Sequence, residues 1–202
     1  MTWEPELEEL RQRQALAREM GGPDKIARQR AAGRLTVRER IGALLDSGSF
    51  HEIGSITGNG AYDETGALQS MTPTNFLFGR GRIEGRRVVV AGDDFTVRGG
   101  ASDASIIEKQ VAAEQMAHEL RLPMIRLIEG SGGGGSVKSL EAMGYTYVPF
   151  LPGFDHMVRN LATVPVVSLG LGPIAGFGAA KVVQSHYSLL VRGQSQMFVA
   201  GP

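Results

Sequence analysis

The pattern of apolar and polar positions predicts a helical beginning for this chain. Residues 4–20 are rich in Glu, Leu, Arg, Gln and Ala, which are good helix formers. Their weak apolar stripe consists of Leu7, Leu10, Ala17 and Met20. Gly21-Gly22-Pro23 ends this helix, and residues 24–32 predict a second one. A capping-box pattern at Thr36 and Glu39, followed by apolar residues at helical spacing, predicts a third helix.

The pattern changes after Asp46, where runs typical of strands replace helical spacing. Residues 51–57 predict a short strand, whereas residues 58–74 contain Gly, Asn, Asp and Pro and predict a loop. Three β-type runs follow, at residues 76–83, 87–91 and 94–97. Glu84-Gly85 predicts a hairpin turn between the first two of these runs.

The second half of the chain repeats one arrangement, in which a strand meets a glycine-rich loop and then a helix. After a helix at residues 103–121, the predicted elements are a strand at 123–128, a helix near 154–162, a strand at 164–170, a helix from about 178, and strands at 185–191 and 196–200. The glycine loops lie at residues 131–136 and 172–178. This order predicts an α/β fold with parallel strands and crossover helices. Both loops would then lie at the carboxyl ends of strands, where ligands bind in such folds.

Composition and charge exclude several functions. The 21 basic and 21 acidic residues balance, so no net field attracts nucleic acid or an anionic membrane. The absence of cysteine excludes disulfides, thiolate nucleophiles and zinc–thiolate sites. Residues 1–9 lack the character of a signal peptide, and prolines and glycines interrupt the apolar run at residues 164–183. We therefore expect a cytoplasmic chain without a membrane span.

The sequence alone allows two interpretations for each of three features: the glycine run, the basic residues near the N-terminus, and a pair of aspartates. Residues 132–135 are four consecutive glycines, which suit either backbone amides aimed at an anion or a flexible surface loop. The nine basic residues between positions 11 and 40 suit either phosphate binding or a solvated helix face. Asp93 and Asp94 end a predicted strand, where such pairs more often cap a turn than bind a metal.

Four stretches in the same order carry a resemblance to a known family. They are residues 27–41 with 44–50, residues 94–100 (DFTVRGG) with Glu108 and Lys109, residues 131–133 (SGG), and residues 172–176 (GPIAG). In these stretches the chain resembles the N-terminal part of the carboxyltransferase (beta) subunit of biotin-dependent acyl-CoA carboxylases, the propionyl-CoA and methylcrotonyl-CoA class.

The resemblance implies a crotonase-like fold, a spiral of ββα units. It divides the chain into an N-terminal helical segment at residues 1–50 and a crotonase-like domain at residues 51–202, incomplete at its C-terminus. It implies transfer of a carboxyl group from carboxybiotin to the α-carbon of an acyl-CoA, through an enolate held by backbone amides. Biotin would be carried by a partner protein, the biotin carboxyl carrier or biotin carboxylase subunit, and no metal is expected. The intact protein would be a homo-oligomer.

The resemblance also implies site residues. Gly176 and Phe177 match a glycine pair whose amides hold the oxyanion, and Phe177 replaces the second glycine. Gly132 and Gly133 match a pair that lines the same pocket, with Ser131 and Gly134 beside them, although the family has Ala-Arg where this chain has Gly134 and Gly135. The substrate side is completed by Gly99 and Gly100, and Arg34 and Arg38 are candidates for the phosphates of CoA.

Length is the largest departure from the family, whose subunits contain two crotonase-like repeats. We therefore expect this chain alone to lack the biotin half and to be inactive without a C-terminal carboxyltransferase half. Two alternatives stay open: a crotonase-type acyl-CoA hydratase or isomerase, and a non-catalytic CoA-binding or assembly fragment. The first needs an acidic pair in the pocket, which neither glycine loop contains. A dinucleotide-binding fold fits less well, because the Gly-x-Gly-x-x-Gly spacing is missing.

Overall fold

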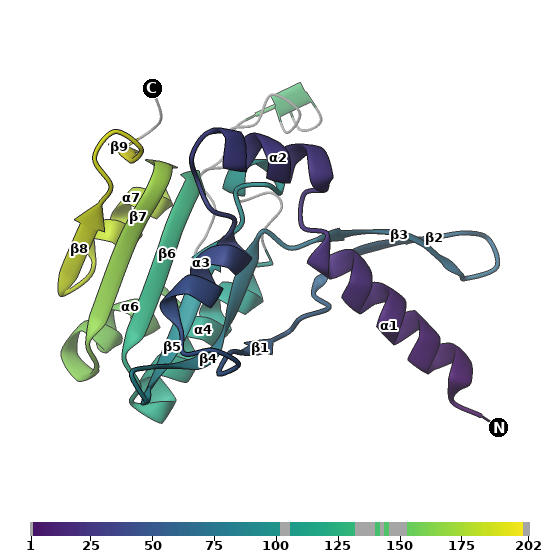
Figure 1. The fold of residues 1–202 in the computed structure, drawn as a ribbon, viewed down its shortest axis with the longest axis horizontal. Helices are drawn as coiled ribbons and strands as arrows, with labels where there is room; N and C mark the ends of the chain where they lie inside the picture. The colour runs from purple at the N-terminus through teal and green to yellow at the C-terminus, as the bar shows by residue number, and fades with distance from the viewer. Residues whose placement is uncertain (1, 102–105, 132–139, 142–143, 146–152, 200–202) are drawn as a thin grey trace.

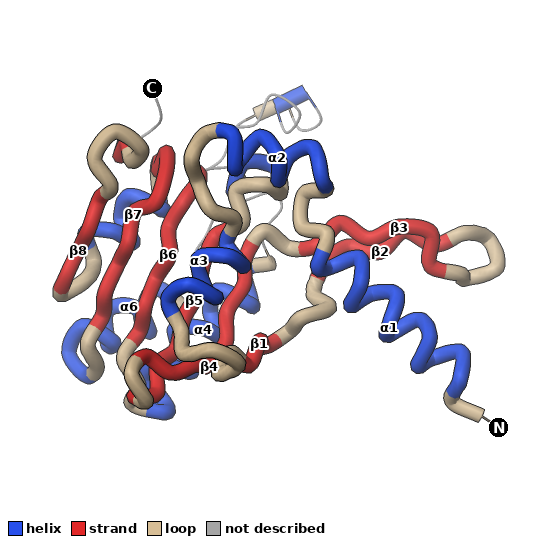
Figure 2. Tube along the Cα trace, in the orientation of Figure 1, coloured by secondary structure: helices blue, strands red, loops and turns tan. Residues whose placement is uncertain are grey.

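A mixed β-sheet forms the centre of the protein (Figures 1 and 2). The computed structural model describes residues 2–101, 106–131, 140–141, 144–145 and 153–199. The sheet has the order β1 (His51–Ile53), β4 (Phe76–Ile83), β5 (Arg86–Asp93), β6 (Met124–Ser131), β7 (Val166–Ala175) and β8 (Tyr187–Leu190), and β9 (Gln196–Phe198) also pairs with β7. The strands β5, β6, β7 and β8 are parallel to one another. At the other edge, β1 pairs with β4 and β4 pairs with β5 in antiparallel orientation.

Helices cover both faces of this sheet (Figure 1). One face carries α3 (Val37–Leu44), and the other carries α4 (Ile107–Leu120) and α6 (Phe154–Thr163). Successive residues of a strand point to opposite faces. Val88 and Val90 therefore pack toward α3, while Val89 and Ala91 pack toward α4. Because α3 packs into this core, the packing continues across residue 50. The division into a helical segment at residues 1–50 and a crotonase-like domain at residues 51–202 stays a prediction.

An arm projects from the sheet and was only half predicted by the sequence (Figure 1). It consists of α1 (Glu4–Arg18) and an antiparallel hairpin of β2 (Gly58–Tyr62) and β3 (Leu68–Pro73). The expected loop at residues 58–74 is therefore wrong. Its polar strands have weak β propensity and depend on each other and on α1, which lies against β3. Leu68 and Met71 are the buried residues of the hairpin.

Two further expectations for strands need correction. Residues 94–97 form a turn rather than a strand, because the Asp94 carboxylate accepts hydrogen bonds from the Thr96 N–H at 2.9 Å and the Thr96 hydroxyl at 2.6 Å. Residues 172–175 belong to β7 rather than to a loop, since Pro173, Ile174 and Ala175 pair with β9. The described residues also include the helices α2 (Pro23–Ala31) and α7 (Phe177–Val183) and the 3₁₀ turn η1 (Arg98–Gly100). No helix among the described residues is long and apolar enough to cross a membrane.

The start of α3 provides a test of local stabilisation. Thr36 accepts a hydrogen bond from the Glu39 N–H at 3.3 Å, and Glu39 accepts one from the Thr36 N–H at 2.7 Å, so the predicted capping box is confirmed. We expect Thr36→Ala to lower the free energy of unfolding by about 1 kcal/mol, measured by urea denaturation. Thr36→Ser keeps the hydroxyl and should retain most of the stability. Equal losses in the two variants would contradict this role of the cap.

Candidate active site

Three glycine-bearing segments meet at the carboxyl ends of β5, β6 and β7. The turn at Gly99 and Gly100 has left-handed backbone angles, with φ of 63° and 69°. A Cβ atom on Gly100 would lie 2.7 Å from the Glu129 carbonyl oxygen, and one on Gly178 would lie 3.3 Å from the Gly130 carbonyl oxygen. The turn after β5, the end of β6 and the start of α7 therefore contact each other. The predicted convergence of the two glycine loops stays a prediction, because residues 132–136 lie outside the described residues.

The start of α7 presents backbone donors, although not all of those expected. Gly176 precedes the helix with φ 59° and ψ −125°, and its own N–H donates to the Phe198 carbonyl in β9 at 3.2 Å. Phe177 and Gly178 are the first helical residues, so their N–H groups have no acceptor within the helix. If an oxyanion binds here, Phe177 and Gly178 would donate to it, and Gly176 would set their direction.

Part of the predicted site lies outside the described residues. Gly132, Gly133 and Gly134 belong to that part, so their proposed roles stay predictions. Ser131 is the last residue of β6, and its backbone is in register with Ala175 of β7. The end of β6 therefore lies beside the segment that leads into α7.

A buried carboxylate joins this end of the sheet to the helices over it. The Glu129 side chain has 0% exposure and lies 2.5 Å from Arg40 Nη2 and 3.1 Å from Arg34 Nε. Gln29 Nε2 donates to it at 2.9 Å. Burial raises the pKa of Glu129, and the Arg40 and Arg34 guanidiniums and Gln29 act in the opposite direction. Glu129 thus links α2 and α3 to β6.

A basic hollow of about 300 Å³ opens beside the Gly99 turn. Its cationic lining residues are Lys25, Arg28, Arg34 and Arg98. Arg34 faces it while stacking on the Phe95 ring at 5.5 Å. Arg38, the other arginine expected to contact CoA, lies elsewhere and is paired with Glu52 at 2.8 Å. The structure therefore groups Arg34 with Lys25 and Arg28 rather than with Arg38.

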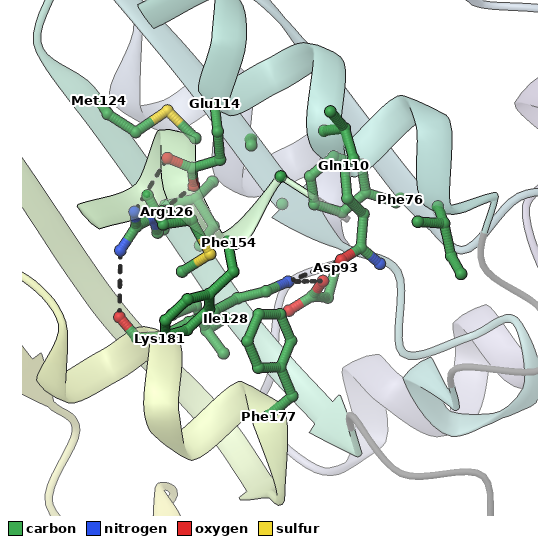
Figure 3. A pocket seen from close by; sticks show the side chains of 17 residues that line it. Phe76, Asp93, Gln110, Glu114, Met124, Arg126, Ile128, Phe154, Phe177 and Lys181 are labelled. Atoms are coloured by element: carbon green, nitrogen blue, oxygen red, sulfur yellow. Dashed lines mark hydrogen bonds and ion pairs between the residues drawn. The ribbon is translucent and has the colours of Figure 1, made fainter. Parts of the chain in front are cut away.

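Behind the sheet edge, a second ion pair faces a small apolar cavity of about 30 Å³ (Figure 3). Asp93 at the end of β5 lies 3.9 Å from Lys181 Nζ in α7, and it also accepts the Glu129 N–H at 3.3 Å. The Lys181 ammonium lies over the rings of Phe76 and Phe177, at 5.4 and 5.2 Å. The pair thereby connects β5, β6 and α7, the three elements that form the site.

The Asp93–Lys181 pair makes stability depend on pH in a predictable direction. Burial raises the pKa of Asp93 from 3.8, and Lys181 is the main opposing cause. An acid whose pKa is raised on folding stabilises the protein below its unfolded pKa, and this contribution disappears as pH rises through the folded pKa. Lys181→Met should raise the pKa of Asp93 further. We expect the variant to lose about 1–3 kcal/mol relative to the parent as pH rises from acid to neutral.

Urea denaturation at a series of pH values measures this loss. The matched control is the double variant Asp93→Asn with Lys181→Met, which has no carboxyl group to ionise and should show no added pH dependence. A constant difference between Lys181→Met and the parent across this range would show that Lys181 does not act on the Asp93 carboxyl.

Sequence reasoning missed Glu129, Asp93 and Lys181 as parts of this site. Asp94 forms the predicted turn, whereas its neighbour Asp93 lies 3.9 Å from Lys181 Nζ in α7. Lys25 and Arg28 had a sequence signal, the excess of basic residues at positions 11–40. Among the residues that the structure describes, no cluster of His and acidic side chains could hold a metal ion.

Comparison with curated proteins finds relatives along almost the whole chain. The propionyl-CoA carboxylase beta chain of Roseobacter denitrificans is 34% identical over 197 residues, which are 97% of this chain and 38% of the relative. The mitochondrial propionyl-CoA carboxylase beta chain of Sus scrofa is 33% identical, over 90% of this chain and 33% of its own. The methylmalonyl-CoA decarboxylase subunit alpha of Veillonella parvula is 27% identical, over 100% of this chain and 38% of its own.

Solved structures agree with these relatives. A transcarboxylase 12S hexamer with methylmalonyl-coenzyme A and methylmalonic acid bound has a TM-score of 0.74 and 25% identity, over 100% of this chain and 38% of that one. The beta subunit of P. aeruginosa geranyl-CoA carboxylase has a TM-score of 0.68 and 31% identity, over 89% of this chain and 33% of that one.

The similarity to these solved structures shows the fold, and it covers only part of the length of each relative. The expected crotonase-like α/β fold is confirmed by these structures. The chain spans about 38% of the length of the relatives named first. Residues 28–202 match the carboxyl transferase domain family. The chain therefore belongs to the carboxyl transferase domain family.

Proposed function

We propose that this chain is the acyl-CoA-binding half of a biotin-dependent carboxyltransferase. The observation that carries the proposal is the convergence of three glycine segments at one sheet edge, beside a basic hollow, in a chain of this family. In this proposal, the backbone donors would hold the thioester of an acyl-CoA and the positive charges would hold its phosphates.

The thioester oxygen would lie at the start of α7. The N–H groups of Phe177 and Gly178, with donors from residues 132–133 on the other side, would hold the negative charge of an enolate. Preorganised amides of this kind typically contribute about 10²–10³ in rate per donor. Phe177 would narrow the pocket at the position where the family has glycine, so we expect a small acyl group.

The phosphates of CoA would lie in the basic hollow. Lys25 and Arg28 are exposed on α2 and line the hollow, so they can approach a ligand without leaving internal partners. Arg34 holds Glu129 at 3.1 Å and would contribute mainly its field.

Carboxybiotin, carried by a partner protein, would supply both the carboxyl group and the base for the α-proton. The residues at this edge are compatible with a base supplied from outside the chain, because three carboxylates here already interact with other groups of the protein. Asp93 faces Lys181, Asp94 accepts from Thr96, and Glu129 faces Arg40 and Arg34. We therefore propose that the biotin-binding half corresponds to the part of the relatives that this chain does not span. The complete site would form within a homo-oligomer.

Deuterium exchange at the α-carbon of propionyl-CoA tests this assignment. The chain alone in D₂O should bind propionyl-CoA without catalysing exchange, as followed by mass spectrometry, because it supplies donors but no base. Crotonyl-CoA should likewise remain unhydrated. Exchange or hydration by the chain alone would instead favour the hydratase or isomerase alternative.

A further inference from the structure

Lys181 places a buried ammonium group in the apolar cavity beside the proposed oxyanion site (Figure 3). The residue is 9% exposed, and its Nζ atom points toward Asp93 and Gln110. The rings of Phe76 and Phe177 face the ammonium, so the apolar walls attract the charge. A buried charge also needs hydrogen-bond partners, because burial removes the water that it would bind in solution.

The hydrogen bonds of this ammonium group are incomplete. It has three N–H donors, and Gln110 Oε1 accepts one of them at 3.2 Å. Asp93 Oδ1 lies 3.9 Å away, which is an ion-pair distance but too long for a hydrogen bond. Within the part of the chain that the structure describes, the other two donors of Lys181 have no acceptor. Asp93 Oδ1 has no donor there either, because the Glu129 N–H donates to Oδ2.

The cavity that these side chains line has room for one small polar group. It measures about 30 Å³, which is more than a water-sized group needs. A hydroxyl oxygen needs about 2.8 Å to each partner, so it can bridge two atoms that lie 3.9 Å apart. It would accept from Lys181 and donate to Asp93. A methyl group would leave both groups unpaired, and a carboxylate would lie against the charge of Asp93.

This cavity lies next to the place where a thioester would bind. Phe177 begins α7, and it also forms part of the cavity wall. Lys181 follows one helical turn later, about 6 Å further along the helix axis. An acyl group whose carbonyl oxygen accepts from the Phe177 N–H therefore has the cavity within reach of a short chain.

We propose that Lys181 and Asp93 recognise a hydroxyl group on the acyl chain, so that the site selects short hydroxyacyl-CoA thioesters. This inference rests on the proposed acyl-CoA-binding function and deepens it by naming the substrate class. A site that pairs with a substrate hydroxyl discriminates against the analogue without one. The preference is moderate here, because a water can bridge the same two groups when the hydroxyl is missing.

Calorimetric titration of the 202-residue chain with thioesters that differ by one oxygen tests the proposal. The matched pairs are 3-hydroxypropionyl-CoA with propionyl-CoA, and 4-hydroxybutyryl-CoA with butyryl-CoA, which reaches one carbon further. In at least one pair the hydroxyacyl thioester should bind about tenfold more tightly. Lys181→Met removes the donor and should bring the ratio of affinities to about one. Asp93→Asn with Lys181→Met should do the same without leaving an unpaired charge, and circular dichroism checks that both variants fold.

Lys25→Ala provides the matched control. Lys25 lines the basic hollow, so its loss should weaken both thioesters of a pair by the same factor and leave their ratio unchanged. Equal affinities within both pairs, or a preference that persists in both Lys181 variants, would overturn the substrate class while leaving acyl-CoA binding intact. A folded chain that binds none of the thioesters would overturn the proposed function and this inference together.

Discussion

Replacing Glu129 with alanine is expected to lower the free energy of unfolding by about 3–5 kcal/mol. The substitution would leave the Arg40 guanidinium, whose side chain is 6% exposed, without its carboxylate partner at 2.5 Å. It would also remove the acceptor for Gln29. Breaking one member of a buried ionic group costs more than the group contributes as a whole, because the remaining charge stays desolvated.

Urea denaturation compares this variant with two others. Glu129→Gln preserves the size of the side chain and should lose less stability than Glu129→Ala. Glu8→Ala removes a carboxylate from an exposed pair, in which Glu8 lies 3.4 Å from Arg11, and should change stability by less than about 1 kcal/mol. A similarly small loss for Glu129→Ala would mean that Glu129 does not hold α2 and α3 to the sheet.

Reversing the charge at Lys25 and Arg28 together is expected to weaken CoA binding about 100-fold. Each residue would lose a charge-assisted contact with phosphate, and two such contacts account for a change of this size. Calorimetry at fixed ionic strength measures the effect, because exposed charges are screened by salt. The parent affinity should also fall as salt is added.

The matched control reverses two neighbouring charges at the other end of the sheet. Arg86 and Arg87 are exposed at the start of β5, so Arg86→Glu with Arg87→Glu makes the same change in net charge far from the hollow. This control should bind CoA nearly as well as the parent. If both double variants weaken binding equally, only overall charge matters and the basic hollow is not the phosphate site.

Sequence reasoning succeeded where the interactions are local. Thr36 and Glu39 are three residues apart and form their capping box within α3. Glu84 and Gly85 have positive φ of 49° and 78° and make the predicted turn between β4 and β5. The strand, glycine and helix pattern also predicted parallel strands, and β6 and β7 are parallel neighbours whose carboxyl ends lie together.

Sequence reasoning failed for interactions between residues that lie far apart along the chain. Glu129 and Gln29 are separated by 100 residues, so no local pattern marks their bond. Asp93 and Lys181 likewise meet only because β5 and α7 end at one edge of the sheet. Gly176 matched a motif for an oxyanion donor, yet β9 returns to take its N–H. Side-chain pairing across elements had to come from the structure.

Calorimetric titration of the chain with propionyl-CoA tests the central claim most directly, with circular dichroism on the same sample. Our account predicts a cooperatively folded chain that binds at one saturable site, with a dissociation constant between about 1 μM and 1 mM, the usual range for enzyme substrates. CoA alone should bind more weakly, because it lacks the thioester oxygen that the α7 amides would hold. A folded chain that binds neither ligand would contradict the account.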